Sequence, residues 1–104
     1  MQSYNTPLND MKFIVEDFLN SGASNTLFKS KNIEVEDFNF ILEEASKFCE
    51  QILLPINQSG DKEGCVFDNG KVKTPKGFKE AYKQFVENGW QGAALDEKYG
   101  GQGL

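Results

Sequence analysis

The sequence contains neither histidine nor arginine, and these two absences limit the chemistry that it can support. Without histidine the chain lacks the commonest general base near neutral pH and the commonest metal ligand. Without arginine it lacks the planar group that binds phosphates and carboxylates in a bidentate manner. Its 11 lysines are outnumbered by 16 Asp and Glu residues, so the net charge is −5. We expect no nucleic-acid binding, because such binding depends on clustered positive charge.

Cysteine and long apolar runs are also scarce. Cys49 and Cys65 are the only cysteines, and without a CxxC pair or a histidine they do not indicate a zinc site. A disulfide between them stays open here, although we expect a reduced, intracellular chain. No apolar run approaches the ~20 residues that cross a bilayer, and the first residues lack a signal-peptide pattern. These observations predict a soluble, cytoplasmic protein with no membrane span.

The composition, 38% apolar and 26% charged over 104 residues, indicates a globular domain with a modest core. We expect a mainly α fold, a small domain of about three helices with a short β-hairpin or extended loop between the second and third. The first helix should run from Pro7 to Leu19, with Thr6 as its N-cap. Its apolar face is so broad that we expect it to be covered on two sides, and Ser21-Gly22 should end it.

The second helix, from about Glu34 to Leu54, has the clearest helical period in the sequence. Its apolar residues fall on one continuous face: Phe38, Ile41, Leu42, Ala45, Phe48, Cys49, Ile52 and Leu53. Pro55 should either end this helix or kink it, with at most an extra turn to about Gln58.

The third helix should open at Thr74-Pro75 and end with Gly89 at the position after its C-cap. Its buried stripe is expected to comprise Phe78, Ala81, Tyr82, Phe85 and Val86. Residues 57–73, between the second and third helices, are rich in Gly and Asp. Within them Asp68-Asn69-Gly70 is a turn sequence able to close a small hairpin. Such a ribbon is marginal alone and needs a surface on which to lie.

The last residues carry a resemblance to a known family. Gly89-Trp90 followed by 97–104, EKYGGQGL, resembles the "GW-x-G … P-E-x-Y-G-G-x-G-L" passage in the amino-terminal region of acyl-CoA dehydrogenases. Residues 48–55 and then Asp61 are similar to that family's "F-x-E-x-x-x-P … D" stretch. Asp96 stands where the family often has proline. The chain has no evident terminal element after Leu104, so we expect it to be truncated there.

A narrower resemblance concerns three further segments, 4–13, 60–65 and 70–78. They are similar to a bacterial branch of the family that includes enzymes resembling 3-methylmercaptopropionyl-CoA dehydrogenase and broad-range fatty acyl-CoA dehydrogenases. The resemblance implies two parts: residues 1–33 as an extra N-terminal helical segment, and residues 34–104 as the N-terminal helical domain. On this resemblance we expect the middle β-domain and the C-terminal helical domain of the family to be absent from the chain.

The resemblance also implies what the complete enzyme does. It would catalyse α,β-dehydrogenation of an acyl-CoA thioester with FAD and pass electrons to an electron-transfer flavoprotein. The family's catalytic glutamate falls beyond Leu104, so we expect no catalytic, cofactor-binding or metal-binding residue in this chain, and no FAD bound to it. Its partners would be the missing domains of the same polypeptide and, in some cases, further copies in a homo-oligomer.

The candidate site residues are those of the carboxyl-terminal motif: Trp90, Tyr99, Gly100, Gly101, Gly103 and Leu104. We expect them to wall the acyl pocket or to contact other domains. For the glycine loop we favour a structural turn over direct ligand contact, because no strand precedes it and no helix follows it. For Trp90 and Tyr99 we favour core or inter-domain packing over a pocket-wall role.

Two clusters of charged residues each allow a functional interpretation and a simpler one as solvent-exposed charges. Five lysines, Lys71, Lys73, Lys76, Lys79 and Lys83, could form a landing site for CoA phosphates or an acidic partner. A solvated helix face is the favoured interpretation, with Lys83 and Glu87 as an ordinary i, i+4 pair. Glu43 and Glu44 are adjacent and do not converge, so we interpret them as solubility charges.

Two other functions compete with the enzyme-fragment hypothesis. The first is a free-standing helical interaction module with no catalytic activity. The second is a small lipid-binding or acyl-binding protein, which would need more apolar residues than a close-packed core consumes. An apolar content of 38% shows no such surplus.

Overall fold

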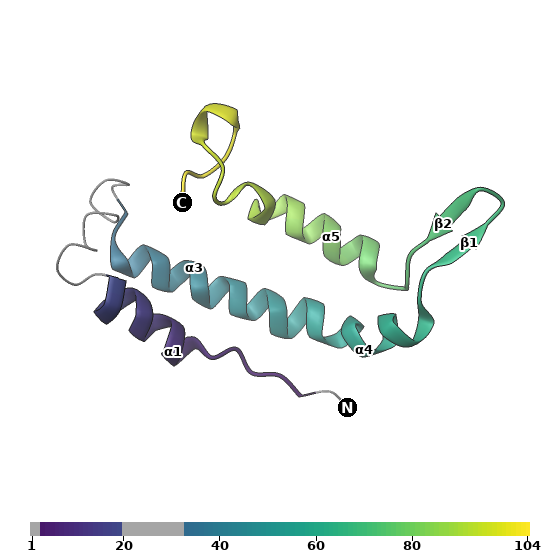
Figure 1. Cartoon of the computed structure of the whole chain (residues 1–104), viewed down its shortest axis with the longest axis horizontal. Coiled ribbons are helices and arrows are strands. Elements are labelled where there is room, and N and C mark those ends of the chain that lie inside the picture. Colours follow the sequence, from purple (N-terminus) through teal and green to yellow (C-terminus); the bar gives the residue numbers. More distant parts are fainter. Residues whose placement is uncertain (1–2, 20–32) are drawn as a thin grey trace. The chain divides into compact units, whose positions relative to one another are not determined.

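The computed structural model describes residues 3–19 and 33–104, and the predicted helix end at Ser21-Gly22 lies outside these residues. The described elements are mainly helical, with a hairpin between the second and third helical regions, which confirms the expected fold class (Figure 1). The chain divides into two compact units, one comprising Ser3–Glu50 and the other containing Gln51–Leu104.

The first unit begins with a short α-helix, α1 (Leu8–Phe13), that widens into a π-helix, η1 (Ile14–Leu19). The predicted N-cap is wrong: Pro7 occupies the N-cap position and no side chain caps the helix. Thr6 has another role, because its backbone N–H donates to Glu50 Oε1 at 2.7 Å. Its hydroxyl oxygen is buried and has no hydrogen-bond partner among the described residues.

The long helix of this unit is α3 (Val35–Phe48), which starts within one residue of the predicted position. The Glu34 backbone N–H donates to Asp37 Oδ2 at 3.2 Å, so an acidic side chain satisfies a donor at the positive end of the helix. Phe48, on the predicted apolar stripe, is only 9% exposed, and Ser46 is 6% exposed.

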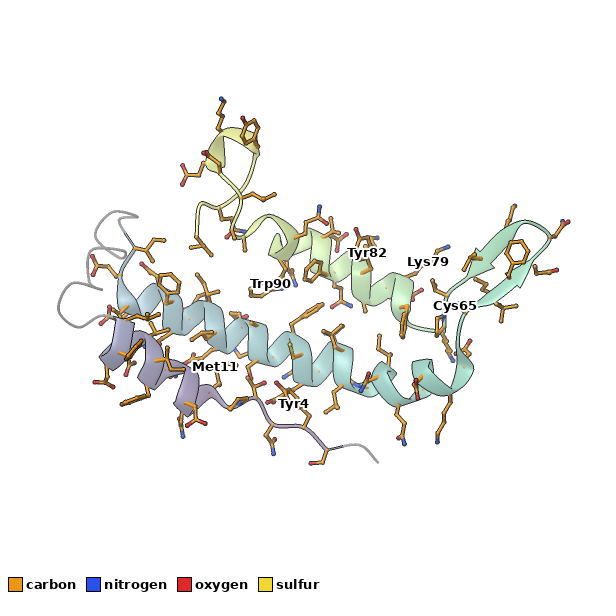
Figure 2. All side chains as sticks on the ribbon, viewed as in Figure 1. Tyr4, Met11, Cys65, Lys79, Tyr82 and Trp90 are labelled. Atoms are coloured by element: carbon orange, nitrogen blue, oxygen red, sulfur yellow. The ribbon has the colours of Figure 1, made fainter. Side chains whose placement is uncertain are left out.

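Polar contacts join α1 and η1 to α3, and their spacing defines an antiparallel pair. Figure 1 shows α1 alongside α3, and Figure 2 shows Met11 on the side of α1 that faces α3. Besides the contact of Thr6 with Glu50, Lys12 forms an ion pair with Glu43, and Asn39 donates to Glu16. As the first partner advances along the chain, the second retreats by a similar number of residues. The register of the pair is therefore specified by polar side chains as well as by apolar packing.

The helical region beyond α3 is longer than the sequence predicted. A π-helix, η3 (Cys49–Leu53), precedes α4 (Leu54–Glu63), so the helix neither ends at Pro55 nor stops near Gln58. Proline lacks the N–H that an α-helix needs, but it is tolerated in the first turn of a helix, where that N–H has no partner. The wide turn of η3 lets α4 begin at Leu54, so Pro55 sits in its first turn.

The hairpin is confirmed. Strand β1 (Val66–Asp68) pairs antiparallel with β2 (Lys71–Lys73), and Phe67 lies opposite Val72. Asn69 and Gly70 have φ values of 49° and 77°, the left-handed conformation that two-residue hairpin turns require. All six strand residues are exposed, which agrees with a ribbon that contributes little to the core.

Helix α5 (Phe78–Glu87) begins three residues later than its predicted opening at Pro75. Pro75 forms a turn instead, in which the Phe78 N–H donates to the Pro75 carbonyl at 3.2 Å. Gly77, with φ of 90°, turns the chain into the helix. The predicted end is confirmed, since Gly89 follows the C-cap with φ of 79°.

The predicted buried stripe of α5 is only partly correct. Ala81 is 6% exposed and Phe85 is half-buried, but three other members stay open: Phe78 at 38%, Tyr82 at 64% and Val86 at 41% exposed. These three are spaced four positions apart, so they form a row beside the buried side of the helix. The helix thus has a second apolar row that remains exposed in this structure.

Candidate functional site

The candidate residues at the carboxyl-terminal end form a closed backbone loop. Two short 3₁₀-helices, η4 (Trp90–Gly92) and η5 (Glu97–Tyr99), are followed by a segment that returns to the first of them. The N–H of Gln102 donates to the Gly92 carbonyl at 3.0 Å, and the N–H of Leu104 donates to the Ala93 carbonyl at 3.0 Å. The structure therefore brings Trp90, Gly101, Gly103 and Leu104 into one local fold.

Within the loop, every backbone N–H from Gly100 to Leu104 has a carbonyl acceptor. Gly100 and Gly101 donate to Glu97 and Asp96 at 3.0 and 3.1 Å, and Gly103 donates to Leu95 at 2.8 Å. A loop that binds phosphate leaves such N–H groups free to face the anion. In this glycine segment the N–H groups donate to carbonyls of the chain's own backbone, which favours the structural turn that was expected.

The three glycines of this loop are needed for different physical reasons. A Cβ on Gly101 would lie 2.1 Å from the Leu95 carbonyl oxygen, so only glycine allows the backbone to come this close. Gly100 has φ of 86° with nothing within 4 Å of the place that a Cβ would take, so its requirement is conformational alone. Gly103 combines φ of 69° with a Cβ position 3.4 Å from Glu97. The motif's spacing thus corresponds to one close contact and two turns.

The two aromatic candidates differ in exposure. Tyr99 is 75% exposed, and the ammonium group of Lys98 lies 5.2 Å from the centre of its ring. Trp90 is half-buried, and its Nε1 is inaccessible and lacks a hydrogen-bond acceptor among the described residues. A buried indole N–H normally has an acceptor. Tyr99 is therefore open to contact from outside this chain, whereas Trp90 has a donor that is not satisfied within residues 3–19 and 33–104.

The expected lysine cluster is exposed on two elements, β2 and α5, and on the turn between them. Lys83 lies 3.7 Å from Glu87, which confirms the predicted i, i+4 pair. Lys76 takes part through its backbone, since its N–H donates to Glu63 Oε2 at 3.1 Å and ties the end of α4 to the start of α5.

Several acidic residues of α3 and η3 are engaged in ion pairs and hydrogen bonds. The Lys12 ammonium group, which hydrogen-bonds to Glu43, lowers the pKa of that carboxyl, and Glu44 raises the pKa of Lys47. The N–H of Thr6 is the main cause of a lowered pKa at Glu50, and the more distant hydroxyl of Ser46 adds to it. The sequence did not indicate the role of Glu50, because its partner is 44 positions away.

Both cysteines are free in the structure: Cys49 is half-buried and Cys65 is exposed. Among the described residues, no group of three or more His, Cys, Asp or Glu side chains is arranged to hold a metal ion. In the same part of the chain, no helix is both long enough and apolar enough to cross a membrane.

Comparison with known proteins agrees with the motifs. Nearly the whole chain is similar to an acyl-CoA dehydrogenase, so the resemblance to this family is confirmed as homology. The relative is the 3-methylmercaptopropionyl-CoA dehydrogenase of Ruegeria pomeroyi, and the two are 36% identical over 102 residues. The match covers 98% of this chain and 17% of the relative, so this chain spans about a sixth of that protein's length. No family model matches the chain.

Proposed function

We propose that this chain is the amino-terminal helical part of a flavin-dependent acyl-CoA dehydrogenase. The observation that carries the proposal is the 36% identity along 98% of the chain. The complete enzyme would remove hydrogen from the α and β carbons of an acyl-CoA thioester and pass electrons to an electron-transfer flavoprotein. Cytoplasmic location is part of the same proposal, as is the division into an extra segment, 1–33, and a helical domain, 34–104.

The residues of this chain do not fit a binding site for FAD. The sequence has no arginine to pair with a diphosphate. The glycine loop, the natural candidate for phosphate contact, donates its N–H groups to backbone carbonyls. The flavin would therefore be held by other parts of the longer polypeptide, and we propose that those parts also supply the catalytic base.

The part proposed for this chain is structural: the closed carboxyl-terminal loop helps to wall the acyl pocket. Three features support that role. The loop is internally hydrogen-bonded, so it can present side chains in a fixed geometry. Tyr99 projects an aromatic ring that is 75% exposed. The Trp90 side chain is half-buried, so part of it remains available for contact with another domain.

The enzyme claim is tested on the complete polypeptide that contains this chain. After loading with FAD, anaerobic addition of saturated acyl-CoA thioesters of several chain lengths, and of 3-methylmercaptopropionyl-CoA, should bleach the flavin absorbance. The matching 2,3-enoyl-CoA is the control, because it has already lost the hydrogens in question and should cause no bleaching. Failure of every saturated thioester to bleach the flavin would remove the proposal.

The pocket-wall role is tested with two aromatic residues of equal exposure. Tyr99→Ala in the complete enzyme should raise KM for the acyl-CoA several-fold, because a wall of the pocket is lost. Phe67→Ala is the matched control, since Phe67 is 74% exposed on the hairpin and lies outside the candidate loop. Equal KM values for both variants and the parent enzyme would show that the loop does not contact substrate.

A further inference from the structure

The segment before α1 is attached to the rest of its unit through its backbone. Residues 3–7 form neither helix nor strand, and every one of them except Thr6 is exposed. The Thr6 N–H donates to Glu50 Oε1 at 2.7 Å, which ties the segment to the start of η3. Because the segment buries little side-chain surface, this hydrogen bond provides much of its attachment. We call residues 3–7 the N-terminal strap.

The strength of this attachment depends on the charge of Glu50. Its Oε1 accepts from the Thr6 N–H and, at 3.4 Å, from the hydroxyl of Ser46, a residue that is only 6% exposed. A hydrogen bond to an ionised carboxylate is about twice as strong as one to a neutral acceptor. The same bonds, led by that of Thr6, lower the pKa of Glu50, so the closed strap and the charged carboxylate favour each other.

The charged side chains of the neighbouring elements have partners of their own. The strap carries no charged side chain, and its one titratable group, the Tyr4 hydroxyl, is neutral in acid. In α3 Lys47 is paired with Glu44, and on α1 Lys12 is paired with Glu43, both at 2.5 Å. The carboxylate that accepts from the strap is therefore the group through which acid or a substitution would act on it.

The pairing of α1 with α3 has contacts that do not involve the strap. Lys12 binds Glu43, and Figure 2 shows Met11 on the side of α1 that faces α3. The Lys12 ammonium lowers the pKa of Glu43, so strong acid weakens this ion pair as well. The apolar contact of Met11 does not titrate. The helix pair can therefore persist when the strap has lost its acceptor.

We propose that the N-terminal strap is a conformational device that opens when the Glu50 carboxylate is neutralised, while α1 stays paired with α3. Opening removes Thr6 from the oxygen that it shares with Ser46, so a carboxyl and a buried hydroxyl become accessible at the start of the π-turn. The strap is fully held above the ordinary Glu pKa of about 4.3 and is released as the pH falls through the lowered pKa of the closed form. The inference does not depend on the proposed enzyme activity.

The test is amide hydrogen exchange, measured by mass spectrometry at pH 7 on the complete polypeptide that contains this chain. Peptides that cover residues 3–8 report on the strap through the Thr6 amide. Glu50→Gln should speed exchange there about tenfold, because a neutral acceptor replaces a charged one, and Glu50→Ala, which leaves no acceptor, should speed it more. Peptides from α3 should keep their protection in both variants. Glu44→Gln is the matched control, because this half-buried glutamate of α3 binds Lys47 of the same helix, and it should leave the strap unchanged.

A pH series tests the strap in the unsubstituted protein. Between about pH 6 and pH 3, strap exchange corrected for its intrinsic pH dependence should rise about tenfold and approach that of Glu50→Gln, which has no carboxyl to titrate there. The comparison removes the effect of Glu43, which titrates in both proteins. Unchanged strap exchange in Glu50→Ala, equal loosening by Glu44→Gln, or loss of protection in α3 together with the strap would each overturn the proposal.

Discussion

Different kinds of contact stabilise the interior of each of the two units of this chain. In Ser3–Glu50, polar side chains reach from one helical segment to another, as between Lys12 and Glu43 or between Thr6 and Glu50. In Gln51–Leu104, the decisive contacts are made by backbone at glycines, as at Gly101 against Leu95. The first unit should therefore respond to pH and to loss of side-chain charge, and the second to the addition of a single methyl group.

The largest expected effect is at Gly101. Gly101→Ala places a methyl group 2.1 Å from the Leu95 carbonyl oxygen, and neither backbone segment can move without breaking loop hydrogen bonds. We expect a loss of about 3 kcal/mol in the local free energy of opening, the upper end of what overpacking costs. Amide hydrogen exchange at residues 102–104 measures it, because those N–H groups close the loop.

Gly100→Ala is the control for this variant. Gly100 has φ of 86° but open space around it, so alanine there should cost only about 1 kcal/mol. Equal effects of the two substitutions would mean that left-handed backbone, and not the close approach to Leu95, explains the sequence of the loop.

A smaller effect is expected at Gly60, which is buried in α4 and touches Phe78. The methyl group of Gly60→Ala would lie 2.4 Å from the Phe78 ring. Overpacking destabilises the fold by about 1–3 kcal/mol. Alanine has a higher helix propensity than glycine, which stabilises the helix by about 1 kcal/mol. The net loss, about 1 kcal/mol in the free energy of unfolding, is measured by urea denaturation.

Two variants sharpen the Gly60 comparison. Gln58→Ala, an exposed position in the same helix, should be nearly neutral. Gly60→Ala combined with Phe78→Leu should recover part of the lost stability, because the smaller side chain relieves the overlap. A stabilising Gly60→Ala would show that the ring moves aside freely and that the contact does not matter.

The smallest expected effect is on the pH dependence of the stability of the first unit. Hydrogen bonds from Thr6 and Ser46 lower the pKa of Glu50 in the folded chain, so its contribution to stability is present above the ordinary Glu value of about 4.3. It is lost as the pH falls through the lowered pKa of the folded chain. Glu50→Gln should remove this part of the acid dependence, and urea denaturation between about pH 6 and pH 3 measures the slope.

Ser46→Ala is a milder variant for comparison with Glu50→Gln. It keeps the ionisable carboxyl and the Thr6 contact, and removes only the hydroxyl at 3.4 Å from Glu50. Most of the acid dependence should therefore remain. If Glu50→Gln leaves the slope unchanged, the contact between Thr6 and Glu50 does not stabilise the unit.

Local signals in the sequence were enough to predict much of the fold. The turn at Asn69-Gly70 predicted the hairpin, and the apolar period predicted the start of α3, because both depend on neighbours along the chain. The end of the second helical region was missed because Pro55 was interpreted as a breaker. Pro55 is accommodated by the π-turn before it, and Gly60 lies against the Phe78 ring, a contact that spans 18 positions of the printed sequence.

The candidate site was less accessible to sequence reasoning. The motif marked which residues matter, but backbone donors and acceptors have no side-chain signature, so the closure of 102–104 onto 92–95 was not predicted. The same holds for Thr6, whose side chain suggested a cap while its backbone N–H binds Glu50. In both cases the partner is chosen by tertiary structure, which a local pattern does not encode.

The π-turn at Cys49–Leu53 has a consequence for how such chains can vary in length. A π-turn closes its hydrogen-bonded ring over one more residue than an α-turn does. A relative that lacks one residue at this place could tighten the turn to α-geometry and still keep a helix on either side. Deletions of a single amino acid should therefore be tolerated in η3 more readily than inside α3, where every later side chain would change face.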